Sequence, residues 1–416
     1  MATPRVEKLL TGIDVGSSKI AVVIAGVTAD GAIHSLGTGV RESLGIRRGY
    51  VVDVAAVDRS VREALEMAER VAGLEVQQAW VGFGGGSIAS SIAYHEERFT
   101  RGQIESDDVD ELHERAAARL IGDQRAVLHA EPMLYTLDGG DGVRDPVGLF
   151  ADRFGVSVHL VEADRGPVSN LVTSVRAAHV DVREVVATMV AAGRSTLTAE
   201  QRDLGTVLVD IGASLTQVGL FVGGMLVGLA TIPSGGGDIT DDIASAFGAR
   251  RSQAELLKCK FGSAISSPRD HQDQLPIDRD AEDEGRDSPK ISRAQLNAVI
   301  RARLDHFVPQ IGTLLKAMGD GGPTGRQLVL TGGGAEIKGI ADYVQGVLGG
   351  SVRTTRPTGI IGQPSSHGGP EFSTAIGLVL HAASPPMDLR PRAGVGTTDD
   401  GAPWWARMAA MWQRGK

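Results

Sequence analysis

Residues 10–26 read LTGIDVGSSKIAVVIAG, and residues 208–223 read LVDIGASLTQVGLFVG. Each stretch is typical of a strand that ends in Asp-x-Gly, followed by a tight turn of small residues and a second strand. The two stretches align at one constant offset, which pairs Asp14 with Asp210. A hairpin duplicated this far apart in the chain predicts two similar lobes, each built on its own sheet.

Both turns have the composition of phosphate-binding loops. Small residues let backbone N–H groups approach phosphate oxygens without steric conflict. An aspartate at the end of each strand can hold Mg²⁺ through water, because this ion keeps most of its hydration shell. We therefore expect Asp14 and Asp210 to hold Mg²⁺ in this way. The expected nucleotide contacts are Asp14, Gly16, Ser17, Ser18 and Lys19 in the first hairpin, and Asp210, Gly212, Ala213 and Ser214 in the second.

A third glycine-rich turn strengthens this interpretation. Residues 328–339 read LVLTGGGAEIKG, which predicts a strand that delivers Gly332, Gly333 and Gly334 to the start of a helix. Glycines at such a junction permit close approach of a nucleotide. Gly236 is expected to contact it as well.

A short predicted helix over residues 252–260 places Glu255 and Lys258 on one face. This pair would grip ribose and adenine or, equally well, would form an exposed ion pair.

The periodicity of apolar residues predicts the remaining elements. A helix over 54–72 ends at Gly73, and a strand over 79–83 precedes three glycines. A small α+β insertion follows, and α/β alternation then resumes. Residues 266–290 are rich in Asp, Arg, Pro and Ser and predict a long solvated loop before a helix over 292–318.

The predicted division is 1–84 and 164–204 for the first lobe, 85–163 for the insertion, 205–236 and 326–383 for the second lobe, 237–325 for its outer subdomain, 384–402 for a flexible linker, and 403–416 for a terminal helix.

Composition excludes several classes of protein. A net charge of −9 argues against a general nucleic-acid binder. The single cysteine, Cys259, rules out an internal disulfide framework and suits a reducing compartment. No stretch approaches the roughly 18 apolar residues of a membrane span, and the first residues contain no apolar signal region. The ten histidines show no metal-ligand spacing.

The C-terminal residues 403–416 read PWWARMAAMWQRGK. On a helix, Trp404, Trp405, Met408, Met411 and Trp412 cover one arc, and Arg407 and Arg414 lie together on the opposite flank. This combination predicts an amphipathic helix lying in an anionic membrane surface. The alternatives are a helix packed on the core and a peptide for the groove of another protein. The Pro- and Gly-rich linker before it argues against the core alternative.

The order of these motifs resembles the actin, Hsp70 and sugar-kinase superfamily, and most of residues 8–382 resemble the FtsA family of bacterial actin-like cell-division proteins. The matching stretches include RAVLHAEPMLY, DPVGLFADRFGVSVHLV and AFGARRSQAELLK, in addition to the three turns quoted above. An insertion after Gly86 is similar to the one that FtsA proteins carry and that actin and MreB lack. The resemblance implies an α/β, bilobed actin-like fold that binds ATP and Mg²⁺ and forms polymers.

The same resemblance implies a peripheral protein on the cytoplasmic side of the inner membrane at the division site, where it would tether FtsZ filaments. The acidic C-terminal peptide of FtsZ would bind the outer part of the second lobe, where Arg293, Arg301 and Arg303 are candidate contacts. Other division proteins would bind the insertion. The alternatives are a PilM-like pilus-assembly adaptor and a small-molecule kinase. The kinase is disfavoured because no sugar pocket or catalytic base is readable.

The second phosphate turn departs from the usual Asp-x-Gly-Gly-Gly-Thr. Ala213, Ser214 and Leu215 occupy the Gly-Gly-Thr places. Backbone donors survive this change, so ATP binding is expected to persist and rapid hydrolysis is not. Any ATPase activity would be weak. The sequence identifies no catalytic residue, and Gln217 is the only candidate for orienting the attacking water.

Overall fold

Both Asp-x-Gly stretches fold into antiparallel hairpins, as their duplication predicts. In this computed structural model, which describes residues 6–100, 102–122, 124–277, 289–319 and 327–390, β1 (Val6–Val15) pairs with β2 (Lys19–Thr28). The second hairpin joins β12 (Thr206–Ile211) to β13 (Thr216–Val222). Each first strand also has a parallel neighbour, β6 (Gln78–Phe83) beside β1 and β17 (Gln327–Thr331) beside β12. The chain therefore contains two sheets of similar construction.

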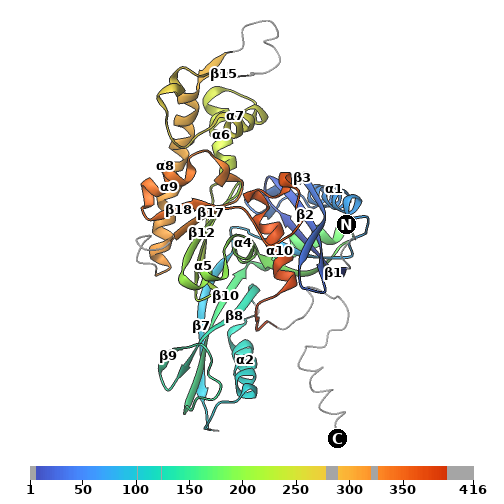
Figure 1. Ribbon diagram of the computed structural model, residues 1–416, viewed down its shortest axis with the longest axis vertical. Coiled ribbons are helices and arrows are strands. Elements are labelled where there is room, and N and C mark those ends of the chain that lie inside the picture. The colour runs from blue at the N-terminus through green and yellow to red at the C-terminus, as the bar shows by residue number, and fades with distance from the viewer. Residues whose placement is uncertain (1–5, 101, 123, 278–288, 320–326, 391–416) are drawn as a thin grey trace.

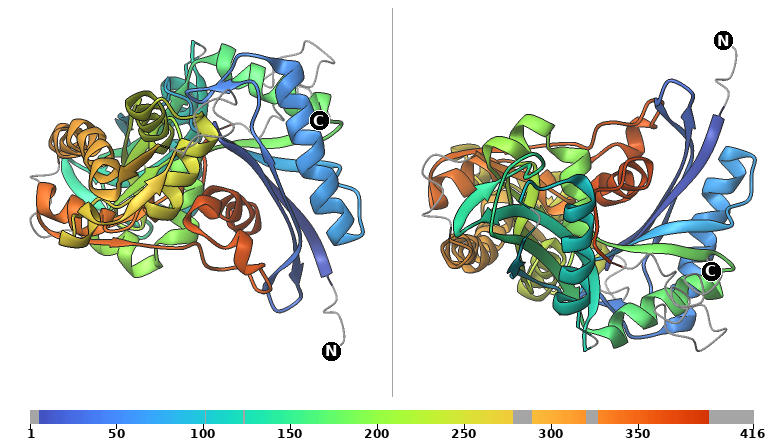
Figure 2. Two further views of the ribbon diagram at one scale, coloured as in Figure 1. Left: turned by 90° about the horizontal axis from the view of Figure 1, so that it is seen from above. Right: turned by 90° about the horizontal axis from the view of Figure 1, so that it is seen from below.

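The first sheet is a layer with helices on both faces (Figure 2). Its strand order is β11-β6-β1-β2-β3, with β3 at Ile33–Glu42 and β11 at Asp181–Ala187. Alternate residues of β2 enter two different cores, which is why the strand is apolar along most of its length. The helices α1 (Val54–Ala72) and α3 (Arg165–Ala177) pack with one core, and α10 (Ser373–Ala383) packs with the other, beside α4 (Thr188–Thr196).

Glycines allow the closest of these contacts. A Cβ at Gly39 of β3 would lie 1.9 Å from the carbonyl oxygen of Ala64 in α1. A Cβ at Gly377 of α10 would lie 1.9 Å from the carbonyl oxygen of Ala191 in α4. Any side chain at either position would push its helix away from the layer beneath it.

The second sheet has the order β14-β13-β12-β17-β18 and a core of its own. Its edge strands are β14 (Met225–Ile232) and β18 (Ser351–Thr354). The long helix α8 begins after Ser292, whose side chain accepts a hydrogen bond from the Gln295 N–H, as a capping residue does. The helices of this lobe are α5 (Ala199–Leu204), α6 (Gly236–Phe247), α7 (Arg251–Phe261), α8 (Arg293–Ala317) and α9 (Ile340–Leu348), and its glycine turn continues as a short 3-10 helix, η3 (Gly333–Glu336).

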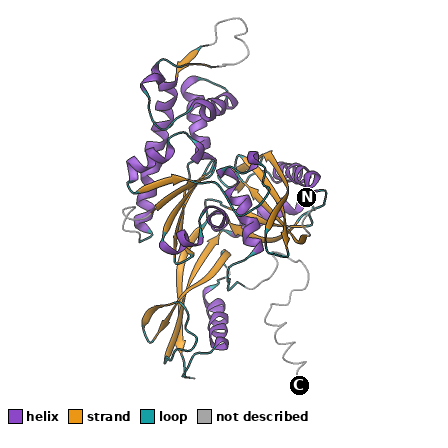
Figure 3. Ribbon diagram, viewed as in Figure 1, coloured by secondary structure: helices purple, strands orange, loops and turns teal. Residues whose placement is uncertain are grey.

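The insertion forms a third body at one end of the long axis, opposite the end that carries α6 and α7 (Figure 1). Its sheet has the order β7-β10-β8-β9, and one helix, α2, packs against it (Figure 3). A separate apolar core lies between them. The elements are β7 (Ala89–Arg98), α2 (Ser106–Leu120), β8 (Ala126–Leu137), β9 (Gly140–Val143) and β10 (Arg153–Ala163).

The predicted solvated loop over residues 266–290 is wrong for its first part. A 3-10 turn, η1 (Pro268–His271), is followed by β15 (Gln274–Pro276), which pairs with β16 (Lys290–Ser292). Asp270 in this turn is buried, because its carboxylate accepts hydrogen bonds from the Ser267 N–H at 2.8 Å and from Asn297 Nδ2 at 3.0 Å. Asn297, which bonds Asp270, lies on α8. Composition alone does not show this buried partner, so it does not reveal that residues 268–276 are ordered.

The first residues of the segment that is predicted as a flexible linker have a defined position in the structure. Residues 384–390 lie against the first lobe and the insertion, and Leu389 packs on the core of the insertion. The later part of the linker and the predicted amphipathic helix over 403–416 lie outside the described residues.

Candidate functional site

A cleft of about 1390 Å³ lies between the two lobes. Residues of both Asp-x-Gly hairpins, the first turn of α6, the helix α7 and the glycine turn before η3 line it. The structure brings together in this one cleft every residue that the sequence predicts to contact the nucleotide: Asp14, Gly16, Ser17, Ser18, Lys19, Asp210, Gly212, Ala213, Ser214, Gly236, Glu255, Lys258, Gly332, Gly333 and Gly334.

The two hairpin turns share the same internal hydrogen bond. The Gly16 N–H donates to the carbonyl oxygen of Lys19 at 3.1 Å, and the Gly212 N–H donates to that of Leu215 at 2.9 Å. The hydroxyl of Ser214 is buried and has no partner among the described residues. The second turn therefore keeps the backbone form of the first despite its altered residues.

Asp14 and Asp210 form an acidic centre that lacks sufficient positive charge. Burial, together with the charge of Asp210, raises the pKa of Asp14 to about 7, although Lys19 opposes this rise. Burial also raises the pKa of Asp210 to about 6. Two carboxylates that resist ionisation are stabilised by a nearby divalent cation. This electrostatic deficit fits hydrated Mg²⁺, the ion expected from the sequence.

The glycine turn packs directly against this centre. Gly332 has φ +82°, and a Cβ there would lie 2.1 Å from Asp210 Oδ1. Gly334 is equally close to Ile211, since a Cβ there would lie 2.3 Å from Ile211 Cγ2. The absence of side chains at these two positions lets the turn approach the phosphate hairpin of the same lobe.

Lys258 is buried in the wall of the second lobe. Its Nζ donates to the carbonyl oxygen of Gly236 and to Thr240 Oγ1, each at 2.9 Å, and to Glu255 Oε2 at 2.8 Å. The side chain of Glu255 remains 45% exposed and lines the cleft. The pair predicted from helix spacing therefore exists, with a buried lysine holding the first turn of α6 and a carboxylate that reaches solvent.

Lys19 has partners other than the two aspartates. Its Nζ lies 3.6 Å from Glu371 Oε1 and 4.0 Å from the centroid of the Phe372 ring. Burial lowers its pKa, although the charge of Glu371 opposes this effect. The lysine is thus held at the edge of the cleft by residues just before α10.

Arg48 is a cleft residue that the sequence analysis missed. It lies on the hairpin of β4 (Ile46–Arg47) and β5 (Tyr50–Val51), in the left-handed region at φ +48°. Its guanidinium crosses to the second lobe, where Nη2 lies 3.2 Å from Asp238 Oδ1 and Nη1 donates to the carbonyl oxygen of Pro233. The signal for this residue is the Arg-Arg-Gly at 47–49, a tight turn with two cations at its tip.

The Arg48 bridge joins two segments that each hydrogen-bond to one Asp-x-Gly turn. On the first lobe, the Gly49 N–H donates to Ser17 Oγ at 3.2 Å. On the second lobe, the Gly236 N–H donates to the carbonyl oxygen of Gly212 at 2.9 Å. The Arg48 contact is therefore one of the links between the two Asp-x-Gly turns, together with the Thr188–Gln217 hydrogen bond.

Gln217 lies in the cleft but its side-chain oxygen is occupied. Thr188 Oγ1 donates to Gln217 Oε1 at 2.6 Å, and Gln217 Nε2 is buried without a partner among the described residues. The amide is left with a nitrogen donor, which can orient an oxygen but cannot accept a proton from water.

Comparison with known proteins decides the family. A family model described as "Cell division protein FtsA" matches residues 207–377, and a second, described as an SHS2 domain inserted in FtsA, matches residues 85–162. The FtsA protein of Rhizobium meliloti is 31% identical over 95% of this chain and 92% of its own length. The chain belongs to the FtsA family. The FtsA protein of Escherichia coli K12 is 28% identical over 98% of both chains.

Solved structures with lower identity agree on the actin-like fold of this FtsA family member. The PilM–PilN type IV pilus biogenesis complex aligns with a TM-score of 0.64 at 18% identity, covering 92% of this chain and all of that chain. MreB5 of Spiroplasma citri bound to ADP aligns with a TM-score of 0.53 at 12% identity, covering 90% of this chain and 96% of that one. The predicted fold class, a bilobed actin-like α/β fold with an inserted subdomain, is confirmed.

The membrane residues predicted from the sequence lie beyond the described part of the chain. They are Trp404, Trp405, Arg407, Met408, Met411, Trp412 and Arg414. Among the helices that the structure does describe, none has the length and apolar character needed to cross a membrane.

Proposed function

We propose that this FtsA family member binds ATP with Mg²⁺ in the cleft between its lobes, forms polymers, and anchors FtsZ filaments to the inner membrane from the cytoplasmic side. The nucleotide part of the proposal is carried by one observation. The half-buried carboxylates of Asp14 and Asp210 share a cleft with two small-residue turns and with the glycines at 332–334. MreB5 of Spiroplasma citri, a structural neighbour, is bound to ADP and to AMPPNP in its solved structures.

Each part of the cleft has a role in this proposal. Asp14 and Asp210 hold the waters of the metal ion, which supplies the positive charge that the phosphates and these carboxylates require. The backbone N–H groups of the two turns bind phosphate oxygens. Lys258 fixes the first turn of α6, and the exposed carboxylate of Glu255 is available to a ribose hydroxyl.

Hydrolysis of ATP in this cleft should be slow. A glutamine amide is not a base, so Gln217 cannot take a proton from the attacking water, and its oxygen is already held by Thr188. The second turn also lacks the usual threonine, since Leu215 occupies that place. The nucleotide then acts by setting the conformation and polymer state of the protein, with little turnover.

Membrane anchoring is assigned to the amphipathic segment at 403–416. Burying its three tryptophans contributes on the order of 10 kcal/mol. Ordering about a dozen residues costs a similar amount. The two arginines add about 1 kcal/mol each near anionic lipid. One tail therefore binds weakly, and a polymer that carries many tails binds much more strongly through avidity.

The FtsZ peptide is expected at the outer part of the second lobe. Of the three candidate arginines there, Arg303 already makes a bidentate pair with Asp242, with both contacts at 2.6 Å. Arg293 lies 3.8 Å from Asp270 and 3.6 Å from Asp273. For Arg301, the described part of the chain supplies no carboxylate within ion-pair distance, which makes it the better contact for an acidic peptide. The insertion is the surface that we assign to other division proteins.

Flotation with vesicles of anionic lipid tests the linking function. Full-length protein with ATP and Mg²⁺ should carry FtsZ into the floating fraction, whereas a chain truncated to residues 1–402 should float neither protein. Full-length Arg301→Glu should float with reduced FtsZ, and FtsZ without its C-terminal peptide should stay at the bottom. If the full-length protein floats but leaves FtsZ at the bottom, the partner assignment is contradicted. If the full-length protein itself does not float, the membrane assignment is contradicted.

A further inference from the structure

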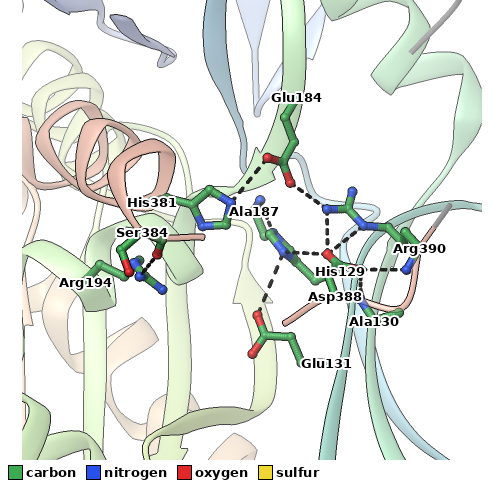
Figure 4. A network of polar contacts seen from close by, with 10 residues as sticks. All are labelled: His129, Ala130, Glu131, Glu184, Ala187, Arg194, His381, Ser384, Asp388 and Arg390. Atoms are coloured by element: carbon green, nitrogen blue, oxygen red, sulfur yellow. Dashed lines mark hydrogen bonds and ion pairs between the residues drawn. The ribbon is translucent and has the colours of Figure 1, made fainter. Parts of the chain in front are cut away.

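Residues 384–390, here called the strap, lie at the junction of the first lobe and the insertion (Figure 4). The Leu389 N–H donates to the carbonyl oxygen of Ala130 at 2.8 Å, and the Ala130 N–H donates to Asp388 Oδ1 at 3.2 Å. Ala130 belongs to β8 of the insertion. The strap is thus held to β8 by one backbone hydrogen bond and one side-chain hydrogen bond, and the Leu389 side chain packs on the core of the insertion.

Arg390 ties the same strap to the first lobe. Its Nη2 lies 2.6 Å from Glu184 Oε1 on β11, and its Nε donates to Asp388 Oδ2 at 2.8 Å. Glu184 Oε2 also lies 3.4 Å from His381 Nε2 on α10. Burial raises the pKa of Glu184, but the hydrogen bonds and charges of His381 and Arg390 outweigh this effect and lower the pKa to about 2. Glu184 therefore remains ionised and paired with Arg390.

The other end of the strap is held as well. Arg194 of α4 donates from Nη2 to the carbonyl oxygen of Ser384. The strap therefore contacts the first lobe at both of its ends and the insertion through Asp388 and Leu389. Figure 4 shows Asp388 and Arg390 grouped with His129 and Glu184, and the Arg194–Ser384 contact to one side.

His129, Glu184 and Asp388 lie close enough to suggest a metal site, since their ligand atoms fall within 4.8 Å of one another. The hydrogen bonds exclude this reading. His129 Nε2 accepts from the Ala187 N–H at 2.9 Å, which places the proton of the neutral ring on Nδ1, the atom that faces Asp388 at 3.8 Å. Arg390 supplies the positive charge between the carboxylates. The cluster is an ion-pair joint.

The insertion also contacts the second lobe. Ser90 on β7 accepts from the Leu229 N–H at 2.8 Å and donates to the Leu229 carbonyl oxygen at 3.5 Å. Arg144 lies 3.3 Å from Asp203, and both side chains are more than half exposed. Among the described residues, the polar contacts with the first lobe are therefore charged and largely buried, whereas those with the second lobe are a serine hydroxyl and an exposed ion pair, beside the packing of β7 and β10 on β14.

We propose that the strap is an intramolecular fastener that locks the insertion to the first lobe and fixes the point from which the C-terminal segment leaves the protein. The insertion then moves as one body with the first lobe when the cleft opens or closes. The residues after 390 start at the joint of these two bodies, so a partner or surface that binds them acts on this joint directly.

Hydrogen exchange and spin-label distances on the full-length chain test the proposal. The variants are wild type, Arg390→Ala and, as a matched control, Arg59→Ala at an exposed position on α1. In the wild type, the amides of Leu389 and Ala130 should be protected. In Arg390→Ala, both should exchange at least ten times faster, while peptides of β12 and β13 keep their protection. Arg59→Ala should match the wild type.

The distance measurement reports the fastening itself. Nitroxide labels at Glu66→Cys on α1 and Glu114→Cys on α2, in a Cys259→Ser background, should give one narrow distribution that broadens in Arg390→Ala. Arg390→Lys keeps the charge but loses the two-pronged contact, so its exchange rates and its distance distribution should lie between those of the wild type and Arg390→Ala. This variant also tests the proposal if Arg390→Ala fails to fold. A strap that exchanges as fast as free peptide in the wild type would overturn the proposal. Unchanged exchange and distances in both Arg390 variants would also overturn it.

Discussion

Arg48 Nη2 on the first lobe lies 3.2 Å from Asp238 Oδ1 on the second, and this contact spans the cleft. Asp238 also accepts the Gly235 N–H at 2.8 Å, so the bridge ends on the first turn of α6, beside the second phosphate hairpin. In the proposed nucleotide complex, a contact of this kind would hold the two lobes together across the cleft.

Replacing Arg48 with alanine should therefore accelerate nucleotide release. The pair is partly exposed, and such pairs contribute about 0.2–1 kcal/mol. The expected effect is an increase of roughly two- to five-fold in the dissociation rate of a fluorescent ATP analogue, measured by stopped flow. Arg47→Ala removes the same charge from the same hairpin and should release the analogue at the wild-type rate. Equal acceleration in the two variants would mean that net charge, and not the bridge, controls release.

Asp210→Asn should have opposite effects on stability and on binding. Because burial raises the pKa of Asp210 to about 6, its ionised form destabilises the metal-free fold above that pH. The neutral amide should raise the free energy of unfolding at pH 8 by roughly 1–3 kcal/mol. It should also weaken binding of Mg²⁺ with ATP. Urea unfolding and calorimetric titration measure the two effects. Asp203→Asn, at an exposed position, should change neither.

Lys258→Met should destabilise the second lobe. The substitution removes three hydrogen bonds from a buried ammonium group and leaves Thr240 and Glu255 without their shared donor. Loss of one partner of a buried charged pair costs roughly 3–5 kcal/mol. Because the Glu255 carboxylate is partly exposed, we expect about 2–3 kcal/mol in urea unfolding. Lys260→Met on the same helix is exposed and should cost less than about 0.5 kcal/mol. Similar losses in the two variants would contradict the role given to Lys258.

Glu131 of β8 lies beside the joint at the strap, with its Oε1 4.0 Å from His129 Nδ1, and its ionisation should loosen the joint as the pH rises. Burial and then the charge of Asp388 raise the pKa of Glu131 to about 7, although Arg194 and Arg390 oppose this rise. For a carboxyl group with a raised pKa, the stabilising contribution is complete below about 4.5 and is lost as the pH rises through about 7. The contribution of Glu131 to the free energy of unfolding should therefore fall by up to roughly 3 kcal/mol between pH 5 and pH 8. Asp14 and Asp210, whose pKa values are also raised, act in the same direction, so Glu131→Gln should reduce the slope without removing it, and an unchanged slope would contradict the role given to Glu131.

The sequence predicts the parts of this protein that depend on local pattern. The duplicated Asp-x-Gly hairpins and the glycine turn at 332–334 carry their own backbone requirements, so their fold and their meeting in one cleft could be inferred from repetition and order. The helix over 54–72 was likewise predicted from apolar spacing and its glycine cap. In each case the information lies within a few residues of the feature itself.

Features held by distant charged partners could not be predicted. The strap contains Pro385 and Pro386 and has the composition of a linker, yet Arg390 pairs with Glu184, far away in the chain. Asp270 was assigned to a solvated loop because its partner, Asn297, lies on another element. Arg48 was missed because the lobe that it reaches is not adjacent in sequence.

Amide exchange of the full-length protein, measured with and without ATP and Mg²⁺, tests the nucleotide cleft most directly. Peptides containing Gly16, Gly212 and Gly332–Gly334 should become protected together, and ATP should protect them only when Mg²⁺ is also present. ADP with Mg²⁺ should protect the same peptides, whereas AMP should not. Protection confined to one lobe, or none at saturating ATP, would contradict the claim that the two Asp-x-Gly turns form one nucleotide site.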